Sequence, residues 1–60
     1  MLKIIILDFE SGEVYITHFD KNKYEDFEDF LLDFNKKFSL ELSETNCEWM
    51  KVENLTVRYL

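Results

Sequence analysis

The spacing of apolar residues predicts one amphipathic helix in the middle of the chain. Across residues 24–38, apolar side chains occupy positions 24, 27, 30, 31, 34 and 38, which fall within an arc of about 120° at 100° per residue. Acids crowd the first half of this segment and two lysines lie in its last turn, an order that the helix dipole favours. Asn22 and Glu25 match a capping box, so we expect Asn22 to cap the helix.

Two segments before this helix predict a β-hairpin. Residues 2–9 (LKIIILDF) are apolar in both phases, as in a central strand that is covered on both faces. Residues 13–19 alternate instead, with Val14, Ile16 and His18 in one phase. The turn between them contains Gly12, which is free to adopt a positive φ. A two-residue and a three-residue loop would place opposite faces of the first strand beside Val14, so the sequence leaves the register open.

The segment after the helix is mostly strand-like from residue 48 to residue 60. One apolar phase includes positions 50 and 52, and the other includes positions 55, 57 and 59. The change of phase at Glu53-Asn54 indicates either a bulge in one strand or a tight turn between two short strands.

These elements predict a single α+β domain over residues 1–60. We expect a small three- or four-stranded antiparallel sheet in β-β-α-β order, with the first strand in the centre and one amphipathic helix on one face. One helix cannot cover both faces of such a sheet. The second face is therefore expected to be open, although the first strand is apolar there too.

Composition strengthens the expectation of an interface. A chain of 60 residues has a thin stability margin, and its single cysteine excludes a disulfide framework. Six Phe, three Tyr and one Trp are more aromatic surface than one short helix can cover. We predict interface anchors among the apolar residues outside the helix, and simple core packing is the competing interpretation. The predicted anchors are Trp49, Met50, Val57 and Tyr59.

The net charge of −6 argues against direct nucleic-acid binding, which requires a basic surface. Carboxylates on the outer side of the helix could instead imitate a row of phosphates and occupy a basic groove of another protein. The residues that would do so are Glu25, Asp26, Asp29 and Asp33. A solvated acidic face is the ordinary explanation, and no calcium-loop pattern accompanies these residues.

Catalytic signals are weak. His18 has no recognisable nucleophile or orienting partner, and Cys47 has acidic neighbours, which oppose thiolate formation. We therefore expect no enzymatic activity, no cofactor and no metal site. The chain opens with neither a basic leader nor a long apolar run, so we expect no membrane association. A lone cysteine fits a reducing compartment, and we expect a cytoplasmic protein.

The sequence thus favours a small acidic protein-interaction module that covers its open sheet face with a second copy or with another protein. Residues of AT-rich codons (Phe, Tyr, Met, Ile, Asn, Lys) number 25, whereas Gly, Ala, Arg and Pro together number two. Such composition is common in phages and mobile elements, where small proteins often inhibit host factors. The alternatives are an acidic nucleic-acid mimic and a structural subunit with no separate activity.

Overall fold

The computed structural model describes residues 2–60, and its first two strands form the expected hairpin. Strand β1 spans Leu2–Asp8 and strand β2 spans Val14–Phe19. Their antiparallel register pairs Leu7 with Val14 and Leu2 with Phe19. In the loop, the Asp8 carboxylate accepts hydrogen bonds from the backbone N–H groups of residues 10 and 11, at 3.0 and 3.4 Å. Gly12 adopts φ 73°, a value that a residue with a side chain rarely tolerates. This loop settles the register that the sequence left open.

The third strand completes a sheet of the predicted topology. Strand β3 spans Cys47–Val52 and pairs antiparallel with β1, so the strand order is β2-β1-β3 with the first strand in the centre. The α+β fold with β-β-α-β element order is therefore confirmed. The predicted strand character beyond Val52 is wrong, because the chain bends at residues 53–54 and residues 55–60 belong to no strand. These last residues are called the tail below.

The helix α1 spans Phe27–Phe38, and its start corrects the predicted cap. Asp26, not Asn22, is the N-cap, and its carboxylate accepts a hydrogen bond from the Asp29 backbone N–H at 2.9 Å. Asn22 instead lies in a turn that Asp20 organises, because Asp20 accepts hydrogen bonds from three following backbone N–H groups. That turn competes with the capping box for the same segment. The helix ends at Ser39, which has left-handed backbone angles.

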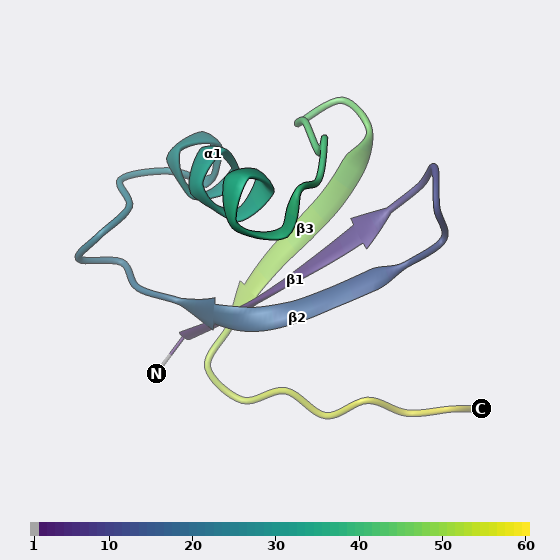
Figure 1. Ribbon diagram of the computed structural model, residues 1–60. Coiled ribbons are helices and arrows are strands. Elements are labelled where there is room, and N and C mark those ends of the chain that lie inside the picture. The colour runs from purple at the N-terminus through teal and green to yellow at the C-terminus, as the bar shows by residue number, and fades with distance from the viewer. Residues whose placement is uncertain (1) are drawn as a thin grey trace.

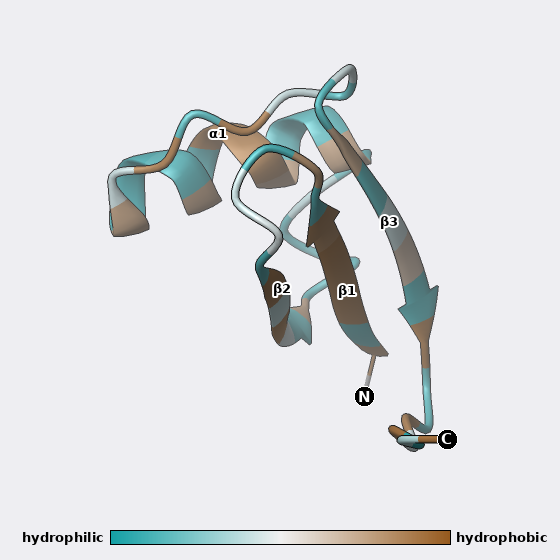
Figure 2. Cartoon of the chain, turned by 90° about the vertical axis from the view of Figure 1, so that its right-hand side faces the viewer, coloured by the Kyte–Doolittle hydropathy of each residue, from teal (hydrophilic) through white to brown (hydrophobic). Residues whose placement is uncertain are grey.

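The helix covers one face of the sheet, as Figure 1 shows. Ile4 and Ile6 of the central strand are fully buried beneath it. The predicted apolar stripe provides the helix side of this core, where four residues are buried: Phe27, Phe30, Leu31 and Phe34. Figure 2 shows the brown apolar side of α1 turned toward the strands and a teal polar side turned away.

The return from α1 to β3 is held by two amide side chains, those of Asn35 and Asn46. Asn46 accepts a hydrogen bond from the Ser43 N–H and donates one to the Glu41 carbonyl. Asn35 donates a hydrogen bond to the Leu42 carbonyl at 2.8 Å and accepts one from the Leu42 N–H at 3.0 Å. Leu42 is buried in the same core. These side-chain hydrogen bonds hold a segment that belongs to no helix or strand.

Candidate protein-interaction surface

The face of the sheet that points away from α1 carries a continuous apolar patch. Because side chains alternate along each strand, Ile5 and Leu7 lie on this face, opposite the buried Ile4 and Ile6. The register brings Ile16 of β2 and Met50 of β3 to either side of Ile5. Val14 lies beside Leu7 in the next row. We call this surface the open face and define it by Ile5, Leu7, Val14, Ile16 and Met50.

Most of the open face is in contact with solvent. The exposed fractions are 43% for Leu7, 56% for Val14, 48% for Ile16 and 51% for Met50. Ile5, at the centre, is only 7% exposed. Four large apolar side chains that are about half-exposed around one buried residue form a contiguous patch, and such patches mark interaction sites more often than isolated apolar residues do.

The two charged side chains at the outward positions of the strands are of opposite sign. The outward positions of the three strands carry Lys3, His18 and Glu48 beside the apolar residues. Of the 13 acids in the chain, only Glu48 lies at one of these strand positions. The others lie on the helix, on the helix side of β1, in the connecting segments or, in the case of Glu53, in the bend between β3 and the C-terminal residues. The net charge of −6 is therefore carried almost entirely by the rest of the molecule.

The four anchors predicted from the sequence do not form one surface. Met50 lies on the open face, but Trp49 points to the other side, where its ring stacks on Phe27 with centroids 4.3 Å apart. Trp49 is 39% exposed, so it is mainly part of the packing between helix and sheet. Val57 and Tyr59 lie in the tail and are exposed. The sequence interpretation grouped Trp49 with Met50, although neighbours in a strand point to opposite faces.

The tail itself passes on the same side of the sheet as the open face. In Figures 1 and 2 it leaves the end of β3 and runs on the side away from α1. Leu55 is half-buried, whereas Tyr59 is 96% exposed. With the tail in this position, the open-face residues other than Ile5 are still in contact with solvent over about half of their surface.

Sequence reasoning missed Leu7, Val14 and Ile16 as interface candidates. Their signals were present: the first strand is apolar in both phases, and the second strand alternates. Only the hairpin register shows that Leu7 and Val14 share a row on the uncovered side.

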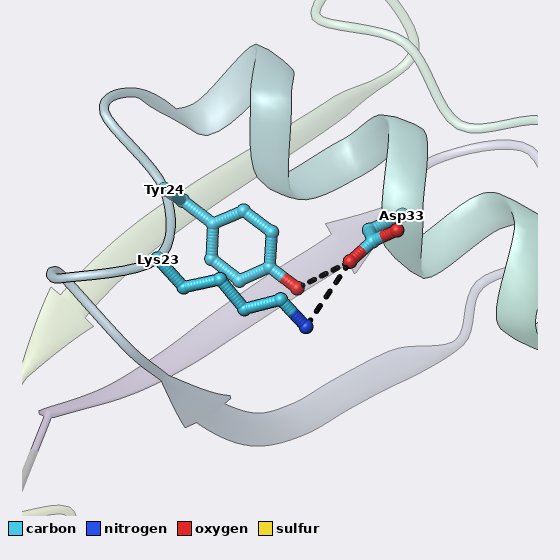
Figure 3. Close-up of polar contacts among 3 residues, drawn as sticks. All are labelled: Lys23, Tyr24 and Asp33. Atoms are coloured by element: carbon cyan, nitrogen blue, oxygen red, sulfur yellow. Dashed lines mark hydrogen bonds and ion pairs between the residues drawn. The ribbon is translucent and has the colours of Figure 1, made fainter.

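The acidic residues singled out on the helix serve different purposes. Asp26 caps α1, and Asp33 accepts a 2.7 Å hydrogen bond from the Tyr24 hydroxyl (Figure 3). Lys23 lies 3.4 Å from the same carboxylate. The Tyr24 hydroxyl and then Lys23 hold the pKa of Asp33 below its ordinary value of 3.8. Within residues 2–60, Glu25 and Asp29 form no ion pair and no side-chain hydrogen bond.

His18 and Cys47, the two residues weighed as catalytic candidates, lie in different surroundings. His18 is exposed on β2. Cys47 is buried, its thiol donates a hydrogen bond to the Ser43 carbonyl at 3.0 Å, and burial raises its pKa, which opposes thiolate formation. Among the described residues, no group of three or more His, Cys, Asp or Glu side chains is placed to hold a metal ion.

In the part of the chain that the structure covers, no helix combines the length and apolar character needed to cross a membrane. No protein-family model, curated protein or solved structure matches the chain.

Proposed function

We propose that this chain is a non-enzymatic protein-interaction module that forms a homodimer by packing one open face against another. The observation that carries the proposal is the contiguous patch of half-exposed apolar side chains around Ile5. Its burial against an equally apolar surface removes both patches from water, which favours association. A domain of 60 residues gains more from such cover than a larger one, because its own core is small.

The distribution of charge supports a second copy as the occupant. Two chains of net charge −6 repel each other at long range. At the open face, however, Glu48 is the only acid and Lys3 offsets it. Two such faces can therefore meet without placing blocks of like charge against each other, whereas the acidic helix side cannot pack on itself.

The size of the open face sets the expected affinity. Three strands of about six residues present a surface of roughly 14 by 20 Å. The resulting area of about 280 Å² is smaller than the ~800 Å² that each partner buries in a standard interface. We therefore expect a weak, reversible dimer rather than an obligate one.

Sedimentation over a wide range of protein concentration, at low and high salt, tests the proposal. Wild type is expected to shift from monomer to dimer with little dependence on salt. Ile16→Lys places a charge in the centre of the patch and is expected to keep the protein monomeric, with the helical circular-dichroism signal unchanged. Leu32→Lys is the matched control, because Leu32 is 69% exposed on the outer side of α1. A wild type that stays monomeric throughout, or an Ile16→Lys dimer as strong as wild type, would contradict the proposal.

The acidic decoy is the second candidate, and the unpaired carboxylates of Glu25 and Asp29 favour it. Asp26 and Asp33 are poor test positions, because their side chains support the local structure. The double reversal Glu25→Lys with Asp29→Lys should abolish binding to a basic nucleic-acid-binding protein, and wild-type binding should weaken steeply with salt. Unchanged binding by the reversed protein would eliminate the decoy. A phage or mobile-element origin and a purely structural role both stay predictions.

A further inference from the structure

Two side chains of opposite charge lie near opposite ends of the open face, and they are too far apart to meet within one copy. Lys3 lies two residues from Ile5 along β1, whereas Glu48 lies on β3, beside Leu7 at the hairpin end. Ideal strand geometry separates their Cα atoms by about 14 Å. Within residues 2–60 the one ion pair present joins Lys23 to Asp33, so neither Lys3 nor Glu48 has a charged partner.

The positions of these two residues suit exchange by a two-fold axis. In the plane of the sheet, the Lys3 Cα lies about 7 Å from the Ile5 Cα along β1, and the Glu48 Cα lies about 8 Å from it toward the hairpin end. The two directions from Ile5 form an angle of roughly 145°. A two-fold axis in the interface that interchanges them must bisect that angle. Such an axis makes the strands of the two sheets cross at about 35°, which is close to the ~30° of aligned sheet packing.

The same axis is compatible with the apolar residues of the patch. It brings Ile16 near Ile16 of the second copy, and Met50 near Met50 of the second copy. Sheets packed face to face are about 10 Å apart, a gap across which extended lysine and glutamate side chains approach each other. The charged pairs then lie at the border of the interface, where their charges remain partly solvated.

We infer that the partner of the open face is a second copy of this chain, oriented by two symmetric ion pairs between Lys3 of one copy and Glu48 of the other. This inference rests on the proposed function and adds the orientation of the two sheets. The ion pairs contribute mainly to specificity, because opposite charges fix the register while the apolar patch supplies most of the affinity. The tail occupies the layer where the second sheet packs, so it has to move aside. Its exposed Val57 and Tyr59 contribute little that would hold it in place.

A charge-swap experiment tests the orientation, with dimer dissociation measured by sedimentation on the full chain. Lys3→Glu and Glu48→Lys each turn two attractions into two repulsions, and each is expected to weaken the dimer about tenfold. The double variant restores both pairs with reversed sign and should recover wild-type affinity to within about threefold. Lys36→Glu is the matched control, since it changes the net charge as Lys3→Glu does but lies in the last turn of α1.

The outcomes separate the two proposals. If Ile16→Lys disrupts the dimer but neither Lys3→Glu nor Glu48→Lys weakens it, the ion-pair orientation is wrong and the proposed function still holds. A double variant as weak as either single one also overturns the orientation. A wild type that never dimerises overturns the proposed function. If a charge reversal prevents folding, the neutral variants Lys3→Gln and Glu48→Gln replace it. Each is expected to weaken the dimer. A dimer whose dissociation constant changes in neither variant refutes the pairing.

Discussion

Trp49 and Met50 are neighbours in the sequence, and their truncation should have opposite kinds of effect. Trp49 is about three-fifths buried and stacks on Phe27, and the Lys51 Nζ lies 5.5 Å from the centroid of the Trp49 ring. Met50 is half-exposed on the open face. We therefore expect Trp49→Ala to destabilise the monomer and Met50→Ala to weaken the dimer.

The magnitude for Trp49 follows from its buried area. A tryptophan of roughly 250 Å² that is three-fifths buried removes about 150 Å² from water, worth close to 4 kcal/mol at ~25 cal/mol per Å². Residual burial in the unfolded chain lowers this to about 3 kcal/mol. A domain of this size has a total stability of roughly 3–9 kcal/mol, so Trp49→Ala should lose a large fraction of it. Met50→Ala should cost the monomer under about 1 kcal/mol.

Urea unfolding followed by far-ultraviolet circular dichroism, at concentrations where the protein is monomeric, measures both effects. Sedimentation of the same variants at high concentration then measures the dimer. Equal losses of monomer stability for the two variants would refute the assignment of these residues to opposite faces. A Trp49→Ala protein with wild-type stability but no dimer would restore Trp49 as an interface anchor.

Three further predictions follow from individual contacts. Asp26→Ala should lower the free energy of unfolding by about 1 kcal/mol, and Asp29→Ala by clearly less, because only Asp26 caps α1; urea unfolding compares them. The folded-state pKa of Asp33 is below 3.8, so its stabilising effect is present above that pH and is lost on further acidification. Acid titration of Asp33→Asn should therefore show a smaller loss of stability than wild type. Deletion of residues 55–60 should lower the dissociation constant of the dimer in sedimentation, because the tail no longer has to move away from the open face. A higher dissociation constant would mean that Val57 and Tyr59 are interface anchors.

The helix could be predicted from local pattern, but its first residue could not. The apolar stripe depends only on the spacing of side chains along one element, so it identified the buried side of α1 correctly. The identity of the N-cap depends on which of several polar side chains accepts hydrogen bonds from the free backbone N–H groups at the start of the helix. Asp20 holds the segment around Asn22 in a turn, and Asp26 is left to cap the helix.

The existence of an apolar open sheet face could be predicted from the sequence, but most of the residues that form it could not. A single helix for two sheet faces, together with apolar residues in both phases of residues 2–9, already indicated an apolar sheet face without cover. The members of that face depend on pairing between strands that are distant in the sequence, and a shift of one residue would exchange the two faces. The tail shows the same limit, because its alternating residues have strand character but no neighbouring strand to pair with.

The sequence alone determined the element order, the single helix with its buried stripe, the acidic charge and the surplus of apolar surface. Each of these depends on residue type and spacing within one segment. The tertiary structure decided the hairpin register, the separation of Trp49 from Met50 and the division of the acids into caps, partners and solvated groups. These features depend on contacts between segments, where the loop around Gly12 and the packing of α1 select one arrangement from several that the local pattern allows.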